Sequence, residues 1–321
     1  MLDSCLRGND ACFLRIQLML LQILVNALAL GASYALLAIG FVLILNATSA
    51  VNFTHGDMVM AGGYTALAVA GGGALPGLAV LAIVIAVMAV IGFVFSGLAY
   101  FPLKSRPPVS VFISTIALGI IFQNSANAWF GAEPRKGPPL FGEGMVEIAG
   151  ITVARQALAI IAIAALLVVA QHLLLARTGL GRKLRATAQD REMAQAIGIP
   201  VNGMIALTFA IGAGLAGAAG MMLSNTFFVT PTDGSNYIIK AYIAVTIGGW
   251  GSLAGAVCGA LLIALFEVLF PSLPLLIPPL KTIAPWLFTQ TAAAILLYAG
   301  LLAIMFFRPQ GLFGETVQRR V

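Results

Sequence analysis

The length of its uncharged, apolar stretches is what most constrains this chain. Seven long windows contain no Asp, Glu, Lys or Arg: 16–56, 58–103, 107–132, 156–176, 193–232, 241–266 and 282–307. A helix that crosses the hydrocarbon core of a bilayer needs about 20 apolar residues. Four windows fit one such helix each, whereas 16–56, 58–103 and 193–232 hold one helix plus a shorter segment.

The composition excludes the main classes of soluble protein. Apolar residues make up 60% of the 321 residues and charged residues only 9%, whereas a soluble domain has about 45–50% apolar and about 25% charged residues. So few charged side chains cannot cover a globule in water. We therefore exclude a secreted domain, a cytosolic enzyme and a nucleic-acid-binding protein, and we expect a protein of the lipid bilayer.

The windows predict an all-α, polytopic membrane protein with about eight or nine membrane helices or half-helices. All segments are expected to be helical, because an open strand edge leaves backbone polar groups unpaired in hydrocarbon. The expected segments are 18–45, 57–71, 77–101, 109–130, 156–176, 203–224, 238–249, 253–270 and 285–307.

One transmembrane domain is expected over residues 18–314, followed by a cytoplasmic tail at 315–321. Residues 1–16 resemble neither a signal peptide nor a helix. We therefore expect residues 1–17 to form a disordered or non-native extension.

Basic residues predict the orientation, because cytoplasmic loops of membrane proteins are enriched in Lys and Arg. The loop 131–155 carries balanced charges, so we expect it outside, together with the N-terminus. Three basic clusters are expected in the cytoplasm: Lys104 with Arg106; Arg177, Arg182, Lys183, Arg185 and Arg191; and Arg308, Arg319 and Arg320.

The net charge of +6 is thus mainly a signal of topology. No basic stripe with interleaved aromatic residues indicates a nucleic-acid partner. Cys5, Cys12 and Cys258 lack a paired or metal-ligand spacing, so we expect neither a disulfide nor a metal site.

Two breaks interrupt the apolar stretches. Irregular backbone at membrane depth is tolerated only where protein buries it or water reaches it, and broken helices often mark a transport route. Two interpretations stay open: the breaks line a translocation pathway, or they are loops at the membrane interface. The candidate pathway residues are Asn52, His55, Gly56 and Asp57 in the first break, and Gly248, Gly249, Gly251 and Ser252 in the second.

Glycine spacing and lone polar residues allow narrower expectations. Gly251, Gly255 and Gly259 recur every four residues and predict three smooth patches on one helix face. An interface turn is favoured for Asp57 over a substrate contact. The remaining lone groups have ordinary explanations: Glu267 reaches the interface from a helix end, Asp233 and Lys240 flank a solvated outside loop, and His172 is packed in a helix.

The segment 177–202 is the least lipid-like part of the chain. Thr187 followed by Asp190 is typical of a capping box, so a helix is expected to begin near Ala188 and to end at Gly198. Met193, Ala194 and Ile197 are predicted to share one face of this helix. A short charged helix with apolar side chains suits docking into a groove on another protein, and a solvated connector helix is the alternative.

Four segments resemble the permeases of branched-chain amino acid ABC transporters, and they occur in the family order across about residues 18–314. They are NFTHGDMVMAGGYTA (52–66), GRKLRATAQDREMAQAIGI (181–199), GGWGSLAGAVCGALL (248–262) and FRPQGLFG (307–314). The chain is most similar to the first of the two paired permeases. Asp57 and Thr54 replace the more usual Glu and Ala, which leaves the substrate's identity open.

The resemblance implies an ATP-driven importer of Leu, Ile and Val in the bacterial inner membrane. Its partners would be a second, paralogous permease, two ABC ATPase subunits and a periplasmic substrate-binding protein. ATP would be bound by the ATPases, because this chain has no phosphate-binding Gly-x-x-x-x-Gly-Lys-Ser/Thr loop; no catalytic residue or cofactor of its own is expected. The residues expected to couple to the ATPases are Arg182, Arg185, Thr187, Asp190, Arg191, Glu192, Ile197 and Gly198.

Other functions compete with this interpretation. The same kind of permease would serve another amino acid, an amide or urea. An ion-coupled secondary transporter would need carboxylates near the bilayer midplane, and Asp57 and Glu267 are the candidates. A membrane-embedded enzyme would need an acid–base or metal constellation, for which His55 with Asp57 is the sole hint.

Overall fold

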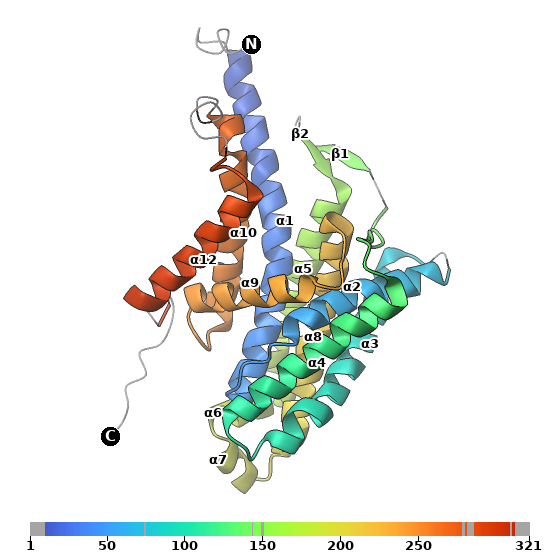
Figure 1. Cartoon of the computed structure of the whole chain (residues 1–321), viewed down its shortest axis with the longest axis vertical. Coiled ribbons are helices and arrows are strands. Elements are labelled where there is room, and N and C mark those ends of the chain that lie inside the picture. The colour runs from blue at the N-terminus through green and yellow to red at the C-terminus, as the bar shows by residue number, and fades with distance from the viewer. Residues whose placement is uncertain are drawn as a thin grey trace.

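The computed structural model describes residues 10–73, 75–142, 144–148, 151–277, 280, 286–308 and 310–311. Within these ranges the chain is a bundle of helices with one small hairpin (Figure 1). The expected tail 315–321, the basic residues Arg319 and Arg320, and the first nine residues of the expected extension lie outside the described residues.

The all-α, polytopic architecture is confirmed. Among the described residues, seven helices are long and apolar enough to cross a membrane. They are α1 (Asp10–Thr48), α3 (Gly77–Phe95), which continues through η1 (Ser96–Tyr100) and η2 (Phe101–Leu103), α4 (Pro108–Phe130), α5 (Arg155–Arg177), α8 (Val201–Phe227), α10 (Leu253–Leu276) and α12 (Gln290–Phe307). The expected segments 57–71 and 238–249 correspond to the shorter helices α2 (His55–Gly71) and α9 (Asp233–Gly248), of 17 and 16 residues.

Several boundaries differ from the expected ones. α1 already begins at Asp10, so the expectation that residues 10–16 are not helical was wrong; no Gly or Pro interrupts the chain between Asp10 and Leu30. α12 begins only at Gln290, where the Thr289 hydroxyl accepts a hydrogen bond from the Ala292 N–H at 3.2 Å.

The connection between α4 and α5 contains an antiparallel hairpin that the sequence pattern did not predict. It pairs β1 (Met145–Ile148) with β2 (Ile151–Ala154). The prohibition on open strand edges applies only within hydrocarbon, so a hairpin in a loop between two membrane helices is compatible with the membrane fold.

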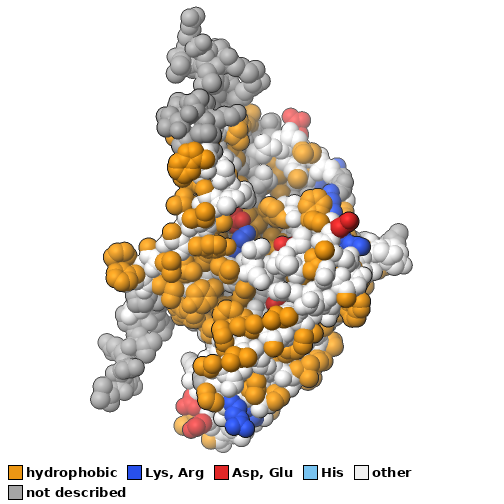
Figure 2. Space-filling model, in the orientation of Figure 1, with side chains coloured by type: hydrophobic (Ala, Val, Ile, Leu, Met, Phe, Trp, Pro, Cys, Tyr) orange, Lys and Arg blue, Asp and Glu red, His pale blue; other side chains and the backbone are white. Residues whose placement is uncertain are grey.

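α1 and α8 form the centre of the bundle. α1 packs against α5, α8, α9 and α10, whereas α8 packs against α1, α2 and α3. α4 and α12 are peripheral, and few of their residues are buried. Hydrophobic side chains cover much of the exposed face, and charged ones are few (Figure 2), as expected for a surface in contact with lipid.

Glycines allow close helix contacts, as expected. A Cβ added at Gly255 would overlap the carbonyl of Gly248, and one at Gly259 would overlap the carbonyl of Ala244, so both glycines bring α10 onto α9. Gly251, however, lies in the connection before α10, with φ +85°. The prediction that it shares a helix face with the other two was therefore wrong.

The loops divide between two ends of the bundle. Lys104 Nζ donates to Asn202 Oδ1 at 3.1 Å, which brings the loop after η2 to the first turn of α8, directly after the short helices α6 (Gly179–Gln189) and α7 (Arg191–Ala196). At the opposite end, Gln22 Nε2 donates to the carbonyl of Thr152 in β2 at 2.7 Å. In Figure 1 these ends lie at the bottom and the top; we call them the coupling end and the hairpin end. The first two basic clusters thus share one end, opposite the loop 131–155, as the predicted orientation requires.

Candidate translocation pathway and coupling segment

The segment between α5 and α8 forms two short helices instead of one. α6 (Gly179–Gln189) begins after Thr178, whose hydroxyl accepts from the Gly181 N–H at 2.9 Å. α7 (Arg191–Ala196) begins after Asp190, whose carboxylate accepts from the Met193 N–H at 2.9 Å. The prediction of a helix start near Ala188 was wrong, because Asp190 itself caps the second helix and interrupts the first. We call residues 178–198 the coupling segment.

The coupling segment turns different side chains inward and outward. Thr187 is buried, and its hydroxyl donates to the Lys183 carbonyl within α6, so it is not a cap. Ala194 is also buried, whereas Met193 and Ile197 are 61% and 67% exposed; the prediction of one shared apolar face was therefore wrong. Exposed charged residues of the segment are Arg182, Lys183, Arg185, Asp190 and Glu192.

Gly198 ends α7 as predicted. Its φ of +83° places it in the left-handed region, which is typical of a glycine that follows a helix. The N–H of Ile199 then donates to the Ala194 carbonyl at 3.0 Å.

Arg191 connects the coupling segment to the helix bundle. Its Nη1 donates to the Tyr100 hydroxyl at 3.0 Å, and its Nη2 donates to Ser49 Oγ at 3.3 Å. Tyr100 is the last residue of the π-helical turn η1, and Ser49 follows the end of α1 with a left-handed φ of +54°. One guanidinium group therefore contacts the ends of two membrane helices.

The first break lies inside the bundle. Asn52, His55 and Asp57 are 4%, 0% and 5% exposed. The Thr54 hydroxyl donates to the Thr115 carbonyl of α4, and the His55 ring Nε2 lies 3.1 Å from the Leu37 carbonyl of α1. Residues 52–57 are thus held between α1 and α4, and they do not form a loop at the interface.

Asp57 lies against the middle of α4. Gln123 Nε2 donates to Asp57 Oδ1 at 2.8 Å, and a Cβ added at Gly119, the central residue of α4, would overlap the carboxylate. A Cβ added at Gly234, in the first turn of α9, would also overlap the Asp57 carboxylate. The favoured interpretation of Asp57 as an interface turn was therefore wrong, and three helices surround its side chain.

The second break lies next to the last turn of α1. Gly249 and Gly251 have φ values of +104° and +85°, and Asn46 Nδ2 donates to the Gly251 carbonyl at 3.0 Å. Ser252 caps α10, because its hydroxyl accepts from the Gly255 N–H at 3.0 Å. Gly248 packs directly on Gly255, so both ends of this break are fixed by contacts within the α9–α10 pair.

A cavity of about 790 Å³ lies between α6, the end of α1 and the second break. Arg185 and Gln189 of α6, Ser49 beside the first break and Gly251 of the second break all line it. His172 of α5 also lines this cavity and is exposed, so the expectation of a packed histidine was wrong. The cavity thus brings together Arg185 of the predicted coupling residues and Gly251 of the predicted pathway residues, whereas Asn52, His55, Gly56 and Asp57 do not line it.

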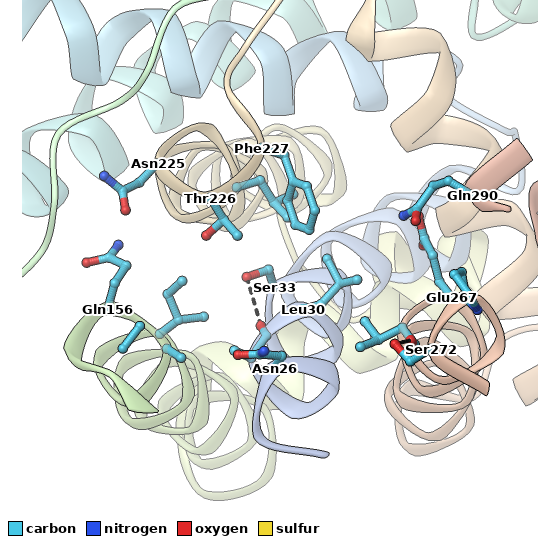
Figure 3. A pocket seen from close by; sticks show the side chains of 17 residues that line it. Asn26, Leu30, Ser33, Gln156, Asn225, Thr226, Phe227, Glu267, Ser272 and Gln290 are labelled. Atoms are coloured by element: carbon cyan, nitrogen blue, oxygen red, sulfur yellow. Dashed lines mark hydrogen bonds between the residues drawn. The ribbon is translucent and has the colours of Figure 1, made fainter. Parts of the chain in front are cut away.

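A second cavity, of about 470 Å³, lies at the hairpin end between α1, α5, α8 and α10 (Figure 3). Its wall is largely apolar, and scattered polar side chains from these helices and from α12 point toward it: Asn26, Ser33, Gln156, Asn225, Thr226, Glu267, Ser272 and Gln290. Sequence reasoning missed this site, because its polar residues come from five helices that are far apart in the sequence.

Glu267 at this cavity is neutralised by a partner. Its Oε1 lies 2.7 Å from Lys240 Nζ, and the Tyr34 hydroxyl donates to its Oε2 at 3.1 Å. Lys240 lies in the middle of α9 and not beside a solvated loop, and Glu267 bonds to it instead of reaching the interface; both expectations were wrong. A paired carboxylate is much less costly in a membrane bundle than a lone one.

Comparisons with known proteins agree with the helical architecture. Residues 23–305 match the family described as branched-chain amino acid transport system / permease component. The chain is 31% identical over 316 residues to the high-affinity branched-chain amino acid transport system permease protein BraD of Pseudomonas aeruginosa, covering 94% of this chain and 98% of that protein. It is 32% identical over 266 residues to the high-affinity branched-chain amino acid transport system permease protein LivH of Escherichia coli K12, covering 78% of this chain and 85% of the relative.

Proposed function

The chain belongs to the family of permease components of branched-chain amino acid transport systems, and we propose that it imports leucine, isoleucine and valine as the membrane subunit of an ATP-driven ABC importer. Two ATPase subunits would bind and hydrolyse ATP. A periplasmic binding protein would deliver the amino acid, and a second, paralogous permease would complete the pathway.

The contact that best supports this proposal is the one between Arg191 and the bundle. The ATPases would dock on the coupling segment, where Met193 and Ile197 offer exposed apolar side chains beside Glu192. When the ATPases close, the displacement of α7 would pass through the Arg191 guanidinium to Ser49 and Tyr100. A forked guanidinium that contacts both helix ends transmits displacement better than a flexible ammonium would.

The displacement would then reach the breaks. Ser49 is three residues from Asn52 in the sequence, so movement of Ser49 would shift the first break directly. Asn46, one turn earlier in α1, bonds to Gly251 in the second break. Alternating access would follow from tilting of α1 and α3 around these breaks, driven from the coupling end.

Purification and transport together test the proposed function. The tagged chain should co-purify from native membranes with a second permease and two nucleotide-binding subunits. Proteoliposomes that hold this complex should accumulate radiolabelled leucine only with ATP and binding protein, and a proton uncoupler should not inhibit accumulation. Uptake that is independent of ATP and abolished by the uncoupler would refute the ATP-driven mechanism. ATP-driven uptake of another solute in place of leucine would refute only the assignment of the cargo.

A further inference from the structure

Asp57 is a buried carboxylate without a counter-charge. It is 5% exposed, and its hydrogen-bond donor among side chains of the described residues is the neutral amide of Gln123. No Lys or Arg in the described part of the chain forms an ion pair with it, whereas the carboxylate of Glu267 in α10 lies 2.7 Å from Lys240 Nζ. A lone charge at this depth is costly, so a function is needed to explain it.

The packing around the carboxylate is built from residues that leave room for it. Gly119 of α4 and Gly234 of α9 both lie where any side chain would overlap the Asp57 oxygens. These glycines come from different helices, so the space is formed by the tertiary arrangement. The site therefore accommodates a carboxylate between α2, α4 and α9.

The side chain of Gln123 separates the Asp57 carboxylate from an exposed polar surface formed by α4 and α9. Gln123 Nε2, which bonds to Asp57, is also 3.5 Å from Ser235 Oγ of α9, and this contact is exposed. On the same stretch of α4, Asn124 and Asn127 are also exposed, and Asn124 Nδ2 donates to the Ile120 carbonyl of its own helix at 2.7 Å. The surface of α4 beside Gln123 therefore carries several amide groups, which suit contact with a polar cargo better than contact with lipid.

We propose that Asp57 binds the primary ammonium group of the cargo amino acid as it passes between α2, α4 and α9. This inference rests on the proposed function and identifies the group that recognises the cargo's positive end. The ammonium supplies three donors and a positive charge, which provides the missing counter-charge. When α4 and α9 separate, the Gln123 amide turns from Asp57, and its N–H groups become available to the cargo's carboxylate.

Transport by the assembled complex is the first test. Asp57→Asn removes the charge at constant size, and it should lower leucine uptake about 10- to 100-fold, the effect expected for one charge-assisted hydrogen bond. Stimulation of ATP hydrolysis by the binding protein should persist, which shows that the variant assembles. Asp57→Glu should recover most uptake, and Asp233→Asn, the same change at a neighbouring carboxylate, should have little effect. Normal uptake by Asp57→Asn would overturn the inference.

A labelling experiment tests the site without transport. Dicyclohexylcarbodiimide modifies carboxyl groups in membrane interiors, and mass spectrometry locates the adduct on the purified complex. Methylammonium and leucine should slow the labelling of Asp57, whereas 4-methylpentanoate, which lacks the amino group of leucine, should not; labelling of Glu267 should not change. Equal protection by all three compounds, or by none, would overturn the inference. Protection by methylammonium in a complex that imports no leucine would refute only the proposed cargo.

Discussion

Arg191 and Ser49 are 142 positions apart in the sequence, yet the guanidinium of the first donates a hydrogen bond to the hydroxyl of the second at 3.3 Å. The same guanidinium bonds to Tyr100. A residue on a short helix at the coupling end is thus joined to the polypeptide that leads into the first break. This contact gives the proposed coupling a specific atomic route that mutation can interrupt.

Arg191→Ala should uncouple ATP hydrolysis from transport. Loss of two charge-assisted hydrogen bonds, each contributing about 1.5–3 kcal/mol, should lower uptake tenfold or more while the complex still hydrolyses ATP. Arg191→Lys should restore uptake only in part, because an ammonium cannot reproduce the forked contact. Arg177→Ala, at another exposed arginine of the same end, is the control. Uptake and ATPase activity that fall in parallel in Arg191→Ala would contradict this route.

The exposed apolar residues of α7 should bind the ATPases. Met193→Asp combined with Ile197→Asp places two charges in the expected groove, so the amount of ATPase that co-purifies should fall at least tenfold, for a loss of about 1.4 kcal/mol or more. Gln195→Asp, an exposed change on the same helix, should not reduce it. Unchanged co-purification of the double variant would exclude this face as the docking surface.

The Lys240–Glu267 pair should stabilise the bundle only as a pair. Glu267→Gln leaves the Lys240 charge unpaired among α1, α9 and α10, which should cost about 3–5 kcal/mol. Lys240→Met combined with Glu267→Leu should cost much less, because no lone charge remains. Thermal unfolding in detergent measures both, and a lower Tm for the double variant than for Glu267→Gln would contradict the prediction.

Gly248 should be intolerant of any side chain. Its added Cβ would overlap the Gly255 backbone, so Gly248→Ala should destabilise the α9–α10 pair by about 1–3 kcal/mol, the usual cost of overpacking. Gly300→Ala in α12 meets open space and should be neutral or stabilising by up to about 1 kcal/mol, because alanine favours the helix. Equal Tm shifts of the two variants would show that the contact is not tight.

The sequence predicted the architecture well where the absence of charge over a long stretch decides it. Charge-free windows located the membrane helices, since hydrocarbon excludes charge and requires internally paired backbone. The left-handed glycine at Gly198 ended α7 as expected. The start of α7 was misplaced, because the sequence pattern favoured Thr187 as the cap. Thr187 is instead buried on α6, and Asp190 caps α7.

The sequence by itself therefore determined that the chain is a membrane protein, where its helices lie, and which segments interrupt the apolar pattern. The tertiary structure alone decided which polar groups meet. It paired Lys240 with Glu267, placed Arg191 on Ser49 and Tyr100, and packed the Asp57 carboxylate against two glycines, with no cation of the described residues paired to it. Local patterns reveal the cost of a buried polar group, but the partner that offsets this cost lies on another helix, and only the fold brings the two together.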